Sequence, residues 1–148
     1  MVVHMRTIQR INQINDEINC LYHAASTKMG LADSEMMILY LLHDHEKLSQ
    51  SDIIQRTGMT KQTVNSAIRR MEKGGWIHLG KRTQHRRIIS LTLLGKQVLQ
   101  QVLGPFIQAE EKIFDDWSQE EINLFLKLNC RYRDQLRHIV DHLSSERR

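Results

Sequence analysis

The stretch SQSDIIQRTGMTKQTVNSAIRRM, residues 49–71, decides the fold because it predicts two short helices joined by a tight turn. Ser49 and Asp52 have the spacing of a capping box that starts the first helix, and Gly58 suits the turn. Thr60 can cap the second helix. The apolar residues of that second helix recur at helical spacing: Val64, Ala67, Ile68 and Met71. Together these features predict a helix-turn-helix.

The opposite face of the second helix is polar without being acidic. Its first two turns lack the Glu–Lys pairs that usually cover an exposed helix face. Gln and Asn side chains can make paired hydrogen bonds with adenine, whereas Arg suits phosphate or guanine. We therefore expect base contacts from Gln62, Thr63, Asn65 and Ser66. Phosphate contacts are expected from Lys61, Arg69 and Arg70.

A basic wing is predicted to follow this helix. The segments WIHL (76–79) and RIISL (87–91) are rich in strand-forming residues and flank a polar, basic stretch. They predict two antiparallel strands around a loop that can reach the DNA backbone or minor groove. The expected DNA contacts of this wing are Lys81, Arg82, Arg86 and Arg87. Residues 61–87 hold eight basic residues against one acidic residue in a chain of net charge +4, which is typical of a polyanion-binding surface.

Long amphipathic helices are predicted on both sides of the motif. Apolar residues at helical spacing predict a first helix over 6–28, which Gly30 ends, and Asp33 can cap the next helix. Thr92 and Ser118 can cap two later helices, with a kink expected at Gly104-Pro105. The predicted fold is mostly α with a small two-stranded β wing, a winged helix-turn-helix within a single domain of residues 1–148.

Three segments resemble the MarR family of winged-helix transcriptional regulators: LADSEMMILYLL (31–42), LSQSDIIQRTGMTKQTVNSAIRRMEKGGWI (48–77) and RRIISLTLLGK (86–96). The resemblance implies a DNA-binding lobe over residues 30–96 and a helical dimerisation lobe from residues 1–29 and 97–148. It also implies a homodimer that binds palindromic double-stranded DNA, usually as a repressor. The family commonly carries Asp-x-Arg in its wing, with the Arg entering the minor groove, where this sequence has Thr83, Gln84 and His85. The resemblance therefore leaves open which of the flanking Arg82, Arg86 and Arg87 enters the minor groove. His85 is also counted among the expected wing contacts.

The same resemblance implies a site for a small lipophilic or phenolic effector. In the family this pocket lies where the dimerisation lobe meets the DNA-binding lobe. The residues expected to line it here are Tyr22, His23, Ser26, Met29, Met37 and Tyr40.

Other functions are weighed against DNA binding. Cys20 admits a redox-responsive regulator, but we interpret Cys20 and Cys130 as small buried apolar residues. His138 and His142 share a helix face, yet two nitrogens fall short of a closed metal site, so no metal or cofactor is expected.

Enzymatic and membrane functions are not expected. The sequence has no G-x-G-x-x-G, no P-loop, no G-x-S-x-G and no H-E-x-x-H motif. No apolar run is long enough for a membrane span, no secretory signal is expected, and two cysteines suit a reducing cytoplasm. A winged helix that binds protein instead of DNA remains the alternative from another class.

Overall fold

The computed structural model describes residues 2–82 and 86–143, with side chains from residue 6 onward. The chain divides into two compact units, Met1–Phe106 and Ile107–Arg148. Each unit is described by itself. His85, one of the expected wing contacts, lies outside the described residues, as do Thr83 and Gln84.

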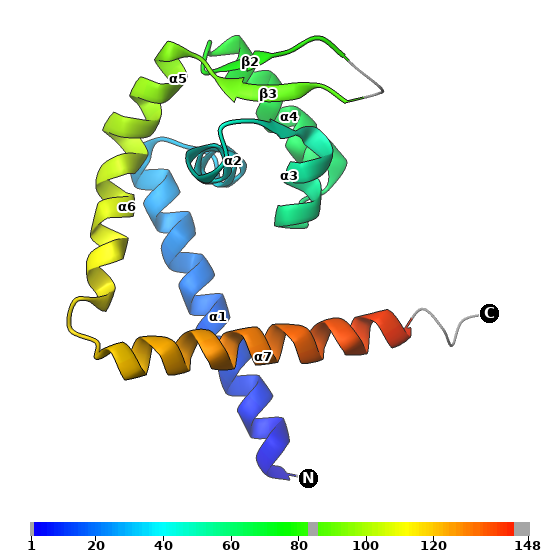
Figure 1. Ribbon diagram of the computed structural model, residues 1–148, viewed down its shortest axis with the longest axis vertical. Helices are drawn as coiled ribbons and strands as arrows, with labels where there is room; N and C mark the ends of the chain where they lie inside the picture. Colours follow the sequence, from blue (N-terminus) through cyan, green and yellow to red (C-terminus); the bar gives the residue numbers. More distant parts are fainter. Residues whose placement is uncertain (1, 83–85, 144–148) are drawn as a thin grey trace. The chain divides into compact units, whose positions relative to one another are not determined.

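The first unit contains the predicted helix-turn-helix and wing (Figure 1). Its elements in chain order are α1 (Val2–Met29), α2 (Asp33–Asp44), β1 (Leu48–Ser49), α3 (Gln50–Thr57), α4 (Lys61–Lys73), β2 (Ile77–Leu79), β3 (Ile88–Leu91), α5 (Leu93–Val98), the π-helical turn η1 (Leu99–Leu103) and the start of α6 (Gly104–Glu111). In Figure 1, α2, α3 and α4 gather beside the ribbon of β2 and β3. The mostly α fold predicted from the sequence is confirmed.

The core of this unit lies where α2, α3 and α4 meet the sheet. Its fully buried side chains include Ile38 and Leu39 of α2, Ile53 of α3, Met71 of α4 and Ile89 of β3. Burying a side chain of this size contributes roughly 1.5–3 kcal/mol. The core therefore fixes α4 with its apolar stripe inward and its polar face outward.

The sheet has three strands, whereas the sequence predicted two. The strand order is β1-β3-β2, and both pairings are antiparallel. In the β2–β3 wing, Ile77 pairs with Leu91 and Leu79 with Ile89. The additional strand β1 pairs Leu48 with Ile89. A two-residue strand shows no alternation of apolar and polar residues, which explains why the sequence pattern did not reveal it.

Most helix starts follow the predicted caps. The side chains of Thr60, Thr92 and Ser118 accept hydrogen bonds from the backbone N–H groups three residues later, at 3.0–3.2 Å. Asp33 differs, because it is the first residue of α2 instead of its cap. The carboxylate of Glu35 accepts the backbone N–H of Ala32 at 2.9 Å. Asp33 is not available for capping because its carboxylate is bonded to α1.

Thr92 and Gly95, which follow β3, lie against Gly75 and Trp76, which precede β2. Thr92 donates its backbone N–H to the Trp76 carbonyl at 3.0 Å and its hydroxyl to the Gly75 carbonyl at 2.5 Å. A methyl group at Gly95 would lie 1.8 Å from the Trp76 carbonyl oxygen, well inside van der Waals contact. Only glycine therefore fits at this crossing.

The helix after the wing passes through Pro105 without ending. The Gly104 N–H donates to the Leu99 carbonyl five residues earlier, within the π-helical turn η1. Pro105 has no N–H to donate. The wider turn directly before it is the kind of irregularity by which a helix accommodates a proline.

The second unit consists of the end of α6, the 3-10 turn η2 (Lys112–Phe114) and α7 (Gln119–Leu143). Ser118 and Glu121 form the predicted capping box, with the Ser118 N–H donating to Glu121 at 2.8 Å. The Trp117 ring meets Phe114 and Phe125 edge to face, at centroid distances of 5.2 and 5.5 Å. Along the described chain, no helix combines the length and apolar character that crossing a membrane requires.

Candidate nucleic-acid interface

The helix-turn-helix is built from three local devices. Ser49 and Asp52 form a reciprocal capping box at α3, in which the Ser49 N–H donates to Asp52 at 2.8 Å. Gly58 ends α3 with φ of +68°, a left-handed conformation that suits glycine. Thr60 then caps α4 through the Thr63 N–H at 3.1 Å. The turn thus fixes where α4 begins and which of its faces is exposed.

The outer face of α4 presents a row of exposed polar side chains. Val64, Ala67, Ile68 and Met71 are all buried, as the sequence predicted. Their burial turns the remaining faces toward solvent. The exposed residues of α4 that were expected to contact DNA are Lys61, Gln62, Thr63, Ser66, Arg69 and Arg70.

Asn65 and Thr63 are already engaged in hydrogen bonds within the protein. Asn65 is half-buried, and its Oδ1 accepts a hydrogen bond from Gln50 of α3 at 2.5 Å. The Thr63 hydroxyl is bonded to that of Thr60 at 2.8 Å. Paired bonds to adenine need a donor and an acceptor, so Asn65 would have to share its oxygen with Gln50 or release it. Gln62 and Ser66 have no partner among the described residues, so their polar groups are available.

Arg70 is tied to α2, which changes the role expected of it. Its Nε lies 2.8 Å from the Glu35 carboxylate and its Nη2 lies 3.2 Å from the Ser34 hydroxyl. The Glu35 side chain is only 11% exposed. A guanidinium held in this way anchors α4 to α2, and half of the Arg70 side chain remains exposed. Glu35 lies among apolar residues on the buried face of α2. A carboxylate at such a position needs a partner, so this pattern in the sequence could have indicated an ion pair with a basic residue such as Arg70.

The wing carries four exposed cations in the described part of the chain: Lys81, Arg82, Arg86 and Arg87. The strands place them at the open end of β2 and β3, where the Gly80 N–H bonds to the Ile88 carbonyl at 2.8 Å. Nothing in the structure pairs these cations with an acidic side chain at ion-pair distance among the described residues. They are therefore available to a polyanion.

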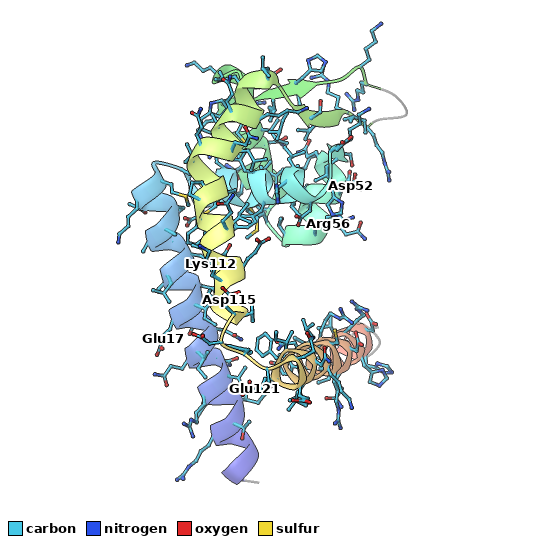
Figure 2. All side chains as sticks on the ribbon, turned by 60° about the vertical axis from the view of Figure 1, so that its left-hand side comes forward. Glu17, Asp52, Arg56, Lys112, Asp115 and Glu121 are labelled. Carbon is cyan, nitrogen blue, oxygen red and sulfur yellow. The ribbon has the colours of Figure 1, made fainter. Side chains whose placement is uncertain are left out.

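Arg86 also acts on the start of α3. Hydrogen bonds from Ser49 lower the pKa of the Asp52 carboxyl below its ordinary value, and the positive charges of Arg86 and Arg56 lower it further. In Figure 2, Asp52 and Arg56 lie along one side of α3. At the start of α3, the negative charge of Asp52 is therefore exceeded by the positive charges of Arg86 from the wing and Arg56 from α3.

A hollow of about 500 Å³ lies between α1 and α2 within the first unit. Four of the expected effector-site residues line it: Tyr22, His23, Met37 and Tyr40. The other lining residues are Asn19, Asp33 and Met36, which the sequence did not single out. A volume of this size is within the range of small-molecule sites.

Ser26 and Met29 are not among the lining residues. Ser26 is buried, and its hydroxyl donates to Asp33 and to the His23 carbonyl, the latter at 2.9 Å. The His23 Nδ1 donates to the Asp33 carboxylate at 2.8 Å. Hydrogen bonds from Ser26 and then His23 lower the pKa of Asp33 below its ordinary value, despite a small opposing effect of burial. Ser26 therefore supports the hollow from behind by holding Asp33 in place.

The cysteines differ from the sequence interpretation. Cys20 and Cys130 are both free and exposed in the single chain, not buried. Both lie on long helices whose apolar residues are also exposed, so helical spacing of apolar residues did not indicate burial within one chain. The ring centroids of His138 and His142 lie 4.1 Å apart, with the ring planes inclined by 50°. Over residues 2–82 and 86–143, no group of three or more His, Cys, Asp or Glu residues is arranged to hold a metal ion.

Known proteins share this arrangement. The repressor YetL of Bacillus subtilis, described as an HTH-type transcriptional repressor, is 29% identical over 103 residues, which cover 67% of this chain and 62% of that protein. The fold matches the DNA complex of MepR from S. aureus with a TM-score of 0.70 and 20% identity, over 85% of this chain and 93% of that one. It also matches NadR in complex with 4-hydroxyphenylacetate, with a TM-score of 0.69 and 17% identity, over 82% and 88% of the two chains.

The family assignment rests on the helix-turn-helix and its wing. The model of the MarR family matches residues 29–88, which run from the end of α1 to the first residue of β3. The relatives YetL and YwoH of Bacillus subtilis are described as an HTH-type transcriptional repressor and regulator, and neither of these descriptions names an enzyme. Residues 29–88 of the chain therefore match the MarR family, and relatives similar to the chain are described as HTH-type transcriptional regulators.

Proposed function

We propose that this protein is a cytoplasmic, ligand-responsive repressor that binds a palindromic operator as a homodimer. The observation that carries the proposal is the exposed polar face of α4 beside four wing cations that form no ion pair within residues 6–82 and 86–143. A helix in the major groove specifies sequence through side chains that reach base edges, while neighbouring cations neutralise phosphates. Occlusion of a promoter by such a protein would repress transcription.

Within this interface, the proposed roles differ between residues. Gln62 and Ser66 are the base-contacting side chains, because their polar groups have no partner within the described protein. Asn65 and Thr63 contribute by donating hydrogen bonds after rearrangement, since each is already engaged. Lys61 and Arg69 on α4 contact phosphate. The wing contributes Lys81, Arg82, Arg86 and Arg87, and His85 remains a proposed member of the same set.

Exposed apolar helix faces support the homodimer. In α1, Ile8, Ile14 and Ile18 are between 43% and 55% exposed, and Leu21 is 70% exposed. In α7 no residue is buried, and its exposed apolar side chains include Phe125, Leu128, Leu136, Ile139 and Leu143. Apolar faces of this extent on a soluble regulator mark a protein interface. We propose that residues 1–29 and 97–148 form the dimerisation lobe and residues 30–96 the DNA-binding lobe.

The hollow between α1 and α2 is the proposed effector site. Its aromatic and methionine side chains suit a small lipophilic or phenolic molecule. The α2 helix that lines it also holds Arg70 of α4 through Glu35. A ligand that moves α2 would therefore act on the helix that contacts the operator.

Salt titrations on two DNAs test the division between α4 and wing. The operator is first selected from a random duplex pool, where a palindromic consensus is expected. Gln62→Ala should then lose roughly 1–3 kcal/mol on the operator and little on random DNA. Arg86→Ala and Arg87→Ala should weaken binding to both DNAs and reduce the salt slope by about one counterion each. Lys28→Ala, which removes an exposed cation at the end of α1, is the matched control and should change neither quantity.

Two results would contradict the proposal. One is an equal loss on both DNAs for Gln62→Ala, because a base contact has no counterpart on random sequence. The other is a consensus without two-fold symmetry together with a monomer mass in sedimentation at micromolar concentration, which would remove the homodimer.

A further inference from the structure

The hollow between α1 and α2 has a negatively charged lining, which favours cationic ligands over anionic ones. Of its seven lining residues, Asp33 carries a full charge at neutral pH, and none is Lys or Arg. The hydrogen bonds from Ser26 and His23 keep the Asp33 carboxylate ionised by lowering its pKa. Ser26 is buried and its hydroxyl donates a hydrogen bond to Asp33, so the protein itself fixes the position of the Asp33 carboxylate.

The two helices around the hollow supply almost no cation. Between Arg10 and Lys28, α1 contains no Lys or Arg, and it carries Asp16 and Glu17. Across α2, residues 33–44 contain no Lys or Arg either. The one basic group at the hollow is His23, and its Nδ1 is already bonded to Asp33. A ligand carboxylate would therefore enter beside Asp33 with no guanidinium or ammonium among the lining residues to pair with it.

The remaining lining side chains suit an organic cation. Tyr22 and Tyr40 are aromatic, and the face of an aromatic ring attracts an ammonium group. Met36 and Met37 provide polarizable apolar surface for a hydrocarbon or aromatic body. A carboxylate accompanied by aromatic and methionine side chains is a combination that recognises a protonated amine.

We propose that the effector of this protein is a lipophilic amine whose ammonium group pairs with Asp33, and not a carboxylic acid. The inference rests on the proposed function, because it takes the hollow between α1 and α2 as the effector site. The fold neighbour NadR was solved with 4-hydroxyphenylacetate, an acid. The ligand class proposed for this chain thus differs in the sign of its charge.

Three probes of nearly equal shape separate charge from size. Tyramine, tyrosol and 4-hydroxyphenylacetate share a phenol ring with a two-carbon substituent. Tyramine and tyrosol end in an ammonium and a hydroxyl group, whereas the second carbon of the acid is its carboxylate carbon. Isothermal titration of the full-length protein should rank tyramine first, about tenfold tighter than tyrosol, because its ammonium group adds the attraction of opposite charges to the hydrogen bond with the Asp33 carboxylate. The acid should bind weakest.

Asp33→Asn tests the role of the carboxylate. This variant should bind tyramine about tenfold more weakly, leave tyrosol binding unchanged and improve binding of the acid. Asp44→Asn removes another acid of α2 that does not line the hollow, so it is the matched control and should keep the wild-type ranking. Circular dichroism and thermal unfolding of both variants show that they are folded.

The ranking in the wild-type protein decides the proposal without any variant. An acid that binds as tightly as the amine, or no binding of any probe at millimolar concentration, would overturn it. Operator binding without ligand is measured in parallel, so that failure of the ligand inference is distinguished from failure of the proposed repressor. A protein that binds its operator but prefers the acid remains a regulator with a different effector.

Discussion

Replacing Gly95 with alanine tests the crossing between the wing and α5. The added methyl group would lie 1.8 Å from the Trp76 carbonyl oxygen and 2.8 Å from its carbonyl carbon. Both are backbone atoms, so no side-chain rotation relieves the overlap. Either α5 or the start of β2 must move by roughly 1.5 Å to restore ordinary contact, since carbon–oxygen contacts lie near 3.3 Å or beyond.

The free energy of unfolding should fall by about 3 kcal/mol. Movement at this point breaks the hydrogen bonds from Thr92 to the Trp76 and Gly75 carbonyls, each contributing about 1 kcal/mol. Overpacking of the surrounding side chains costs a further 1–3 kcal/mol, roughly. The better helix propensity of alanine offsets about 0.5–1 kcal/mol of this loss.

Urea unfolding followed by circular dichroism at fixed protomer concentration measures the change, since the proposed dimerisation would make the midpoint depend on concentration. Gly104→Ala is the matched control, because its added methyl group meets nothing nearer than the Leu99 carbonyl oxygen at 3.4 Å. That variant should be neutral or more stable by up to about 1 kcal/mol. A Gly95→Ala protein with an unchanged midpoint and slope would refute the steric reasoning.

Three further predictions concern α3 and α4. Thr60→Ala should cost about 1 kcal/mol of stability in urea unfolding, with Thr60→Ser close to wild type, because serine preserves the cap. Because the pKa of Asp52 is lowered in the folded state, the ionised carboxylate stabilises the fold above about pH 4, and this stabilisation is lost as pH falls further. Asp52→Asn should therefore be less stable at neutral pH, and its free energy of unfolding should depend less on pH below about pH 4. Equal acid sensitivity of the variant and the wild-type protein would contradict this prediction. A double-mutant cycle with Glu35→Gln and Arg70→Met should give a coupling free energy of only about 1 kcal/mol, because Arg70 is half exposed and its charge is screened by solvent. Additive effects of the two substitutions would show that this ion pair does not anchor α4 to α2.

Local signals in the sequence predicted much of the fold. The caps at Thr60, Thr92 and Ser118 and the left-handed glycine at Gly58 depend on residues only a few positions apart, so their spacing is visible in the chain. The same holds for the apolar stripe of α4. The strand β1 was missed because two residues carry no pattern, and it exists only through pairing with Ile89, about forty residues away.

The candidate interface was predicted less completely, because the bonding of its polar side chains depends on residues that are far apart in the chain. Composition identified the polar face of α4 and the basic wing, but it could not show which polar groups are already bonded. Gln50 reaches Asn65 from fifteen positions away, and Glu35 reaches Arg70 from thirty-five. Such pairs depend on how α2, α3 and α4 pack together. The exposure of Cys20 and Cys130 likewise depends on what covers the long helices, which apolar spacing alone does not specify.

The first turn of α2 joins two surfaces through three consecutive residues. Asp33 is bonded to Ser26 and His23 of α1, while Ser34 and Glu35 hold Arg70 of α4, the proposed DNA-contacting helix. A ligand that draws Asp33 away from α1 therefore acts on the turn that positions α4. Thermodynamic linkage makes this coupling reciprocal: if an amine lowers the affinity for the operator by some factor, the operator lowers the affinity for the amine by the same factor. DNA-bound and free protein would then respond to the same effector at different concentrations, with the free protein being the more sensitive of the two.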